Sequence, residues 1–270
     1  MSVLMEDSEK KIKDTLVELI SVRSDTGTTL EKDVEKYIYD WLQKLDYFKS
    51  NINNLGSYPL KNDSLERVDV WGLIKGVGRK TAILLNHHDV VDAYDYQTLK
   101  AYAYRPELLR EMLKDVELER DIEDDLKSGE WIFARGAADM KAGIAIQLSL
   151  VEAFSKQQKF NGNILFISVA DEESLSLGMR SSAELLEKIK KKFDLEYTIL
   201  IDSEPHQKTE NNEGVFYTGS VGKLMPVVYV RGKKTHIGDI FQGFNPLFLL
   251  SQIASKTELN SDFSDRKSVV

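Results

Sequence analysis

The 270-residue sequence contains no cysteine. Disulfide bonds, thiolate nucleophiles and cysteine-based zinc sites are therefore excluded, and the absence fits a reducing compartment. The sequence also lacks an excess of basic side chains, because 36 Lys and Arg stand against 44 Asp and Glu, for a net charge of −8. Nucleic-acid-binding proteins present a basic face, so this balance argues against a nucleic-acid partner.

Long hydrophobic runs are absent as well. No apolar stretch reaches the roughly 18 residues of a membrane span, so no membrane partner is expected. The first residues, MSVLMEDSEKKIKD, carry acids where a signal peptide has its apolar core, which indicates a cytoplasmic protein. What the sequence does contain is 42% hydrophobic and 30% charged residues, a composition typical of a soluble protein with an ordinary core.

The apolar patterns predict alternating helices and strands. Helices are expected over 5–22, 30–45, 106–118, 139–158 and 174–191, and strands over 68–74, 81–87, 163–170 and 197–202. The first two strands are predicted to form a hairpin, and 92–130 is interpreted as an inserted, solvated excursion. The alternation predicts an α/β fold, with a mixed, mostly parallel sheet and helices on both of its faces.

The pattern changes after Asn212. Residues 214–218 and 224–230 are β-rich, and a helix is expected over 245–254. We therefore interpret 1–212 as an α/β domain and 213–270 as the first part of a smaller α+β domain.

One motif, WIFARGAADMKAG over residues 131–143, runs from an apolar strand end through small residues into a helix. Asp139 lies where that helix is expected to begin. The small residues before it allow the backbone to approach a ligand closely. Aspartate is also a favoured residue at helix N-termini, so this motif alone leaves a ligand and a helix cap as open alternatives.

Three further polar clusters directly follow predicted strands, where open α/β sheets bind their ligands. These clusters are His87–Asp89, Asp171–Glu173 and Asp202–Glu204. On an extended backbone His87 and Asp89 share one side, as expected for an imidazole that binds metal and a carboxylate that orients it. The alternative is a histidine that is only hydrogen-bonded near a strand end, and His88 is given no role.

The carboxylates favour a cation at this edge. Three consecutive acids repel one another unless cations or donors share their charge, although a solvated loop is the alternative. One of them is predicted to bind metal and its neighbour to act as general base. Imidazole and carboxylate ligands without sulfur suit Zn²⁺, Mn²⁺ or Co²⁺. Two such ions about 3.5–4 Å apart, bridged by a carboxylate, would activate a water molecule.

Taken together, these motifs resemble those of the M20 metallopeptidases, a family that includes amino-acid deacylases, carboxypeptidases and dipeptidases. They occur in the family's order within about 5–255. The matching motifs are His87-x-Asp89-Val90-Val91, Arg135-Gly136-Ala137-Ala138-Asp139-Met140-Lys141-x-Gly143, Asp171-Glu172-Glu173 and Glu204-Pro205. The sequence GEWIFARGAADMKAGIA and the long insertion before it look most like the arginine-utilisation branch of that family.

The resemblance implies a catalytic domain that holds two divalent metal ions, with zinc expected and cobalt or manganese as alternatives. His87 would bind one metal, with Asp89 orienting the site. Asp139 would bridge both metals, and the peptide bond after this residue is often cis in the family.

The resemblance also assigns the remaining acids. Glu172 would be the general base, and Glu173 would bind the other metal. Glu204 matches the next family ligand through its proline neighbour, and Asp202 is the alternative ligand because some relatives use an aspartate near this position.

His236 matches a histidine of the family's lid domain, which in dimeric relatives reaches the partner's active site and stabilises the oxyanion. An exposed histidine at a strand end is the alternative. The resemblance makes 213–270 the first part of a lid and dimerisation domain, so a homodimer is expected. The family pattern also needs a later metal-binding histidine, and none follows His236. We therefore expect that ligand, the returning lid strands and the last part of the catalytic domain to be missing from these residues.

The predicted function is metal-dependent hydrolysis of an amide or peptide bond. The expected substrate is a short peptide or an N-acyl amino acid, with a link to arginine catabolism as the finer expectation. One alternative is a non-catalytic or truncated relative that binds a metabolite or a partner. Another is a centre with a single metal, held by His87, Asp139 and Glu204.

Overall fold

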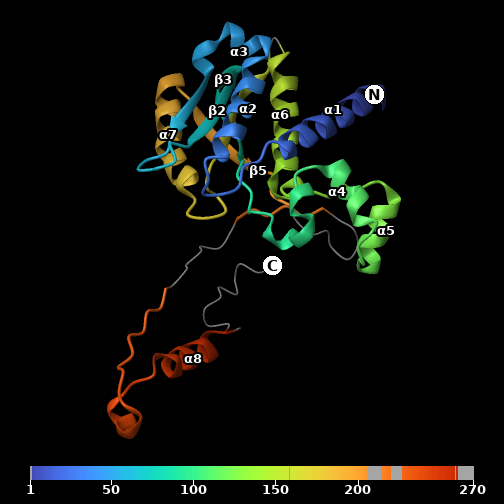
Figure 1. The fold of residues 1–270 in the computed structure, drawn as a ribbon. Helices are drawn as coiled ribbons and strands as arrows, with labels where there is room; N and C mark the ends of the chain where they lie inside the picture. The colour runs from blue at the N-terminus through green and yellow to red at the C-terminus, as the bar shows by residue number, and fades with distance from the viewer. Residues whose placement is uncertain (1, 158, 206–213, 220–226, 259, 261–270) are drawn as a thin grey trace. The chain divides into compact units, whose positions relative to one another are not determined.

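The computed structural model describes residues 2–157, 159–205, 214–219, 227–258 and 260. The chain divides into two compact units, residues 1–205 and 206–270. Each unit is described by itself. Figure 1 shows the elements of both units along the chain.

The first unit contains five strands and seven α-helices among its described residues. The strands are β1 (Leu55–Pro59), β2 (Val68–Lys75), β3 (Val77–His87), β4 (Asn161–Val169) and β5 (Glu196–Asp202). The α-helices are α1 (Ser2–Ser21), α2 (Glu31–Gln43), α3 (Asp46–Ser50), α4 (Pro106–Leu113), α5 (Arg120–Ser128), α6 (Ala142–Ser155) and α7 (Leu177–Phe193). Shorter helical turns are η1 (Ile52–Asn54), η2 (Tyr94–Tyr102) and η3 (Ala137–Lys141). Each helix and strand that was given a range between residues 5 and 202 overlaps one of these elements. The strand end expected at the start of the 131–143 motif is wrong, because residues 131–133 form neither a strand nor a helix.

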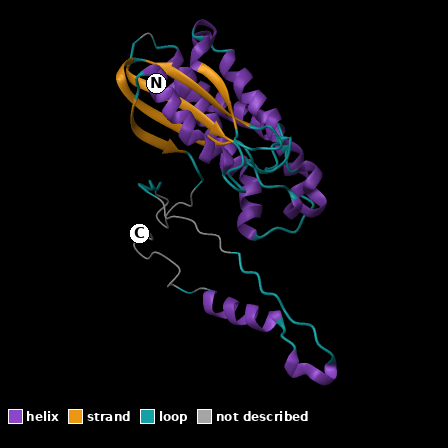
Figure 2. Ribbon diagram, turned by 90° about the vertical axis from the view of Figure 1, so that its left-hand side faces the viewer, coloured by secondary structure: helices purple, strands orange, loops and turns teal. Residues whose placement is uncertain are grey.

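The strands form one mixed sheet in the order β1-β2-β4-β3-β5. β3 is parallel to both β4 and β5, whereas β2 is antiparallel to both β1 and β4. Four strands therefore run in one direction and only β2 is reversed. Figure 2 shows the sheet in orange with helices packed on it. The predicted fold class, a mixed and mostly parallel sheet in an α/β arrangement, is confirmed.

The predicted hairpin is wrong, because β4 lies between β2 and β3. The side chain of Asn163, near the start of β4, bonds to the residue that connects β2 and β3 and to β3 itself. Its amide oxygen accepts a hydrogen bond from Gly76 N at 3.2 Å, and its amide nitrogen donates to Lys80 O at 3.1 Å. β4 is apolar on both faces, which favours a central position with a strand on each side.

Alternate residues of the central strands point to opposite faces of the sheet and form two cores. Phe166 and Leu84 pack on the face covered by α1, α2 and α6. Leu165 and Ile167 pack on the other face, against Leu185 of α7. Figure 1 shows α7 on the opposite side of the sheet from α1 and α6. Helices therefore cover both faces, as the sequence predicts.

The described part of the second unit contains η4 (Ile237–Gln242) and α8 (Pro246–Thr257). The helix expected over 245–254 is confirmed. Within 214–219 and 227–258 the backbone forms no strand, and a single bridge pairs Lys233 with Phe244. Part of the β-rich pattern, residues 220–226, lies outside the described residues. The assignment of 213–270 as a lid stays a prediction.

Across the residues that the structure describes, every helix is too short or too polar to cross a membrane.

Asp69 on β2 is a buried acid with incomplete hydrogen bonding. Its side chain is fully buried, and Oδ1 accepts one long hydrogen bond, 3.4 Å from Ala170 N. Oδ2 has no hydrogen-bond partner among the described residues. Burial raises the pKa of Asp69 to about 8, and the neighbouring charge of Glu35 contributes in the same direction. The ionised carboxylate is therefore a cost to the folded state.

We expect Asp69→Asn to stabilise the fold by about 1–3 kcal/mol at pH 8, because the amide has nearly the same shape but carries no charge to desolvate. The pKa of Asp69 rises on folding from its ordinary value of 3.8 to about 8. The stability that the protonated acid contributes is therefore full below about pH 4 and is lost as the pH rises through about 8. Urea denaturation at several pH values measures this. The exposed control Asp124→Asn should change little, and an Asp69→Asn variant less stable than wild type at pH 8 would contradict the prediction.

Candidate active site

The carboxyl ends of β3, β4 and β5 meet at one edge of the sheet because these strands are parallel. His87 pairs with Val169, and Leu85 pairs with Asp202, so the strands end at nearly the same level. The three polar clusters predicted from sequence lie at these ends, because they begin at the last residue of β3, two residues after β4 and at the last residue of β5. The topology therefore brings residues from three separate parts of the chain to one place.

Three predicted ligands converge at this edge. His87 Nε2 lies 3.0 Å from Asp139 Oδ1 and 3.5 Å from Glu204 Oε1. One ligand atom from each of these residues lies within 4.8 Å of the other two. The imidazole is only 2% exposed, whereas the side chains of Asp139 and Glu204 are 53% and 41% exposed. The cluster is therefore buried on the histidine side and open on the carboxylate side, where a small molecule can approach.

The hydrogen bonds of His87 suit a cation in this position. Its Nδ1 lies 3.0 Å from the backbone oxygen of Asp89, which can only accept, so Nδ1 carries a proton. Without a proton, Nε2 would direct its lone pair at two carboxylates, which are acceptors too. Burial by itself lowers the pKa of His87, but hydrogen bonds with Asp139 and Asp89 outweigh burial and raise it to about 11. With protein groups alone a proton must separate these acceptors, and a metal ion can take the same place.

The surrounding acids repel one another. Partial burial raises the pKa of Glu204 to about 7, and the charges of Asp202 and Asp139 add to this. Burial also raises the pKa of Glu173, again with a contribution from Asp139. The pKa of Asp202 rises for the same reason, with the charge of Glu172 adding to the effect. A positive ion among these groups would relieve the repulsion.

Asp139 lies in the irregular turn η3, and the Asp139–Met140 peptide bond is cis, as the family resemblance predicts. The helix-cap alternative for Asp139 is wrong, because the residue before α6 is Lys141 and no side chain caps this helix. Gly136 has φ +74°, and a Cβ there would lie 2.6 Å from Val90 Cγ1. Only glycine fits a turn that passes so close to the segment after β3.

Gln147 on α6 links the segments that carry the predicted ligands, and sequence reasoning missed it. Its amide nitrogen donates to Leu85 O at 2.7 Å and to Ser203 Oγ at 3.0 Å, and its oxygen accepts from Asn86 at 2.8 Å. These contacts tie the end of β3 to the residue before Glu204. The sequence offers one signal, a polar residue placed between the apolar Ile146 and Leu148 of this helix.

Asp89 connects His87 to the loop after β4. The carboxylate of Asp89 is fully buried; Oδ1 accepts from Glu172 N at 3.0 Å, and Oδ2 accepts from Glu173 N at 3.1 Å. Its contact with His87 is closer through the backbone oxygen, at 3.0 Å, than through the carboxylate, at 3.5 Å. Asp89 therefore touches the imidazole and holds the backbone of the two glutamates.

Not every predicted site residue joins the three-residue cluster. Among the described residues, Glu172, Glu173 and Asp202 lie outside it, although their charges act on its members. His88 is buried with Nδ1 3.0 Å from Ser168 Oγ. His236 belongs to the second unit, is exposed, and accepts a hydrogen bond from Gly238 N through Nδ1 at 3.1 Å. Its reach toward an active site stays a prediction.

The sequence pattern that defines Peptidase family M20/M25/M40 matches residues 83–248. This span contains all three residues of the converging cluster. The chain belongs to this family. The family predicted from the motifs is thereby confirmed, and the M20 relatives allow a comparison over the whole chain.

Two curated M20 relatives come from Bacillus subtilis. The uncharacterised protein YqjN is 36% identical over 257 residues, which make up 93% of this chain and 46% of YqjN. Protein RocB is 32% identical and matches 95% of this chain and 46% of its own length. The chain therefore spans about half the length of these relatives.

Solved structures share the fold. A tripeptidase from Staphylococcus aureus superimposes with a TM-score of 0.55 at 16% identity, covering 94% of this chain and 57% of that one. Human carnosine dipeptidase 1 gives a TM-score of 0.53 at 19% identity, covering 74% of this chain and 40% of the dipeptidase chain. These two similarities show that the chain shares its fold with the two peptidases.

Proposed function

We propose that this chain is the metal-binding part of an M20 hydrolase that cleaves an amide or peptide bond in a short peptide or an N-acyl amino acid. The convergence of His87 Nε2 with carboxylate oxygens of Asp139 and Glu204 carries the proposal. The substrate class is supported by the printed names of structures with the same fold, a tripeptidase and a dipeptidase. The membership of the chain in a peptidase family supports the reaction type.

The residues fit divalent metal ions. His87, Asp139 and Glu204 offer one nitrogen and two carboxylates, a donor set that suits zinc, with cobalt and manganese as alternatives. In the proposed dinuclear centre Asp139 would bridge the two ions and Glu173 would bind the second, with Asp202 as the alternative to Glu204. When bound, these ions would polarise the substrate carbonyl and lower the pKa of a water molecule.

The chain's own residues handle the proton. Glu172 would accept a proton from the attacking water at its carboxylate and then donate that proton to the leaving amine, so that it ends the cycle ionised again. The buried carboxylate of Asp89 holds Glu172 N at 3.0 Å and so limits where this base can move. The carbonyl of Asp89 keeps the Nδ1 proton of His87 in place, which leaves Nε2 free for a ligand role.

The finer parts of the proposal concern pathway and assembly. The sequence of residues 129–145 and the insertion over 92–130 favour a substrate connected with arginine breakdown. The second unit would contribute to a lid and a homodimer, in which His236 serves the partner's active site by stabilising the oxyanion. We also propose a cytoplasmic location for the protein.

The test has two parts. A zinc titration of the metal-free chain, measured by calorimetry, should give two equivalents of bound zinc per chain. The complete protein should hydrolyse members of a panel of dipeptides and N-acetyl amino acids. One equivalent per chain would replace the dinuclear centre by a single metal at His87, Asp139 and Glu204. A chain that binds no zinc, cobalt or manganese would contradict the proposal and favour a non-catalytic relative.

A further inference from the structure

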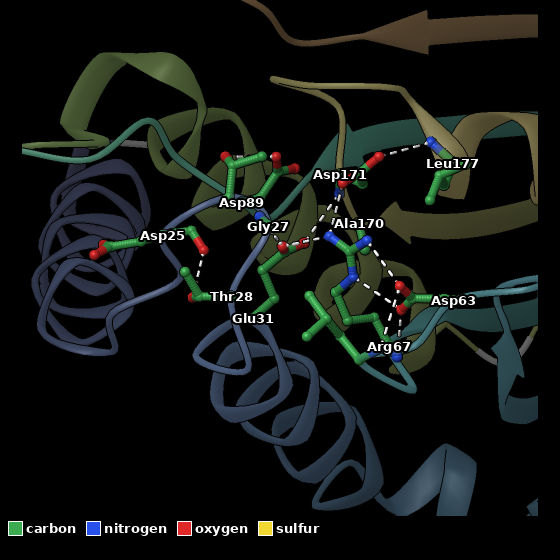
Figure 3. Close-up of polar contacts among 12 residues, drawn as sticks. Asp25, Gly27, Thr28, Glu31, Asp63, Arg67, Asp89, Ala170, Asp171 and Leu177 are labelled. Atoms are coloured by element: carbon green, nitrogen blue, oxygen red, sulfur yellow. Dashed lines mark hydrogen bonds and ion pairs between the residues drawn. The ribbon is translucent and has the colours of Figure 1, made fainter.

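The loop after β4 is held by its backbone through three consecutive N–H groups. Asp171 N donates to Glu31 Oε2 at 3.0 Å, and the next two amides donate to the carboxylate of Asp89. Both accepting carboxylates are fully buried and come from other parts of the chain. Figure 3 shows Glu31, Asp89 and Asp171 meeting at this point. The side chains of Glu172 and Glu173 take no part in these bonds.

Glu31 lies at the start of α2 and joins the loop to the rest of the fold. Its Oε1 accepts from Gly27 N at 2.8 Å and from Arg67 Nη1 at 2.6 Å. The turn before α2 also reaches the loop's other anchor, because Thr26 Oγ1 donates to Asp89 Oδ2 at 2.9 Å. One short segment, residues 26–31, therefore fixes both carboxylates that hold the loop.

Arg67 supplies the positive charge of this network. Its side chain is 3% exposed, and Nη1 also donates to Asp171 Oδ1 at 2.7 Å. The rest of the guanidinium binds Asp63, through Nε at 2.9 Å and Nη2 at 3.0 Å. In Figure 3 Arg67 stands between Asp63 on one side and the pair Glu31 and Asp171 on the other. Removing the partner of a buried charge leaves that charge uncompensated, so Glu31 and Asp171 depend on Arg67.

Asp171 has a backbone conformation that needs external support. Its φ is +64°, in the left-handed region that non-glycine residues rarely adopt. Its Oδ2 accepts from Leu175 N at 3.3 Å and from Leu177 N at 3.2 Å, which closes the loop onto the start of α7. The contacts with Glu31 and Arg67 hold this residue at the point where the chain turns from β4 toward the two glutamates.

We infer that Glu31 and Arg67 are positioning residues, which fix the backbone of 171–173 so that Glu172 and Glu173 are presented at the sheet edge beside His87. The inference rests on the proposed function, because it gives these two glutamates their roles. The inference gives the first residue of α2 and the residue before β2 a part in the active site, although neither belongs to any of the sequence motifs.

The decisive variant is Glu31→Gln, tested in the full 270-residue chain. Glutamine has nearly the same shape, but its amide nitrogen takes the place of one acceptor and faces a donor. The matched control is Asp63→Asn, which alters a buried partner of the same guanidinium but makes no contact with 171–173. Amide hydrogen exchange of the metal-free chain, followed by NMR, reports on the loop without any metal or substrate.

We expect the amides of 171–173 to exchange at least about tenfold faster in Glu31→Gln, relative to amides in β4, and to stay within about twofold in Asp63→Asn. Cobalt titration should show a parallel loss in Glu31→Gln, about 10–100-fold in affinity for the equivalent that depends on Glu173. Faster exchange that is uniform across β4 and the loop, or equal in both variants, would overturn the inference.

Two further results separate this inference from the proposed function. A wild-type chain that binds no zinc or cobalt would overturn the proposed function, whatever the exchange of the loop. A chain that binds both equivalents with an unchanged loop in Glu31→Gln would overturn the positioning role alone. If Glu31→Gln does not fold, Arg67→Lys gives the same readouts, because it keeps the charge but loses the fork that reaches several carboxylates.

Discussion

Replacing Glu172 with glutamine should lower kcat for hydrolysis of a dipeptide or an N-acyl amino acid by about 10²–10⁴-fold in the complete protein. The carboxylate is proposed to take a proton from water, and an amide of the same shape cannot do so. The substitution leaves the backbone bond from Glu172 N to Asp89 intact, so the loop should keep its position. Glu172 is also outside the converging cluster, so zinc affinity should change little.

Steady-state kinetics with a parallel zinc titration test this expectation. A fall in kcat with unchanged zinc stoichiometry and little change in KM identifies a group that acts in the chemical step. Glu173→Gln is the informative comparison, because it should weaken binding of the second metal as well as lower the rate. The exposed Glu107→Gln variant should match wild type. Full activity in Glu172→Gln would remove this residue from the proposed mechanism.

The convergence of His87, Asp139 and Glu204 could be predicted from sequence because its signals are local. His87 is the last residue of the apolar strand β3, and Glu204 comes two residues after the end of β5. Parallel strands bring their carboxyl ends together in any α/β sheet, so adjacency in the chain was enough to predict adjacency in space. Asp139 needed the small residues around it, and the structure resolves its role in favour of the contact with His87 over a helix cap.

The supporting network could not be predicted in the same way, since its contacts join distant residues. Glu31 and Asp171 are 140 positions apart, and Arg67 and Asp171 are 104 apart. The sequence carries one indirect signal, because Glu31 falls on the face of α2 that also buries Val34 and Ile38. An acid on the apolar face of a helix needs a buried partner. Its identity depends on the packing of separate elements, which periodicity does not report.

Strand order was the other feature that local patterns missed. β2 and β3 are separated by a single residue, and a tight connection of this kind favours a hairpin. In the structure β4 takes the place between them, because it is apolar on both faces and bonds to a neighbour on each side. The error concerns only the path of the chain. It leaves the carboxyl edge unchanged, which is why the site prediction did not depend on it.

Asp139→Asn should reduce zinc affinity by more than about 100-fold, beyond the 10–100-fold loss typical of residues that only support a ligand. Asp139 is proposed to bind both ions, so a neutral amide at this position weakens both equivalents together. The metal-free chain offers an independent readout. The hydrogen bond to Asp139 is the largest influence that raises the pKa of His87, so this pKa should fall from about 11 in the variant.

Calorimetry and an NMR titration of the His87 ring measure these two effects, and Asp124→Asn on the exposed face of α5 is the matched control. Together the two measurements distinguish binding of metal by Asp139 from its contact with the His87 imidazole, which a loss of activity alone would not do. A lower His87 pKa with two zinc equivalents still bound would mean that Asp139 only contacts the imidazole. The metal-binding set would then have to be built on His87 and Glu204, with Glu173 and Asp202 as the remaining carboxylates at this edge, and the bridging role would be wrong.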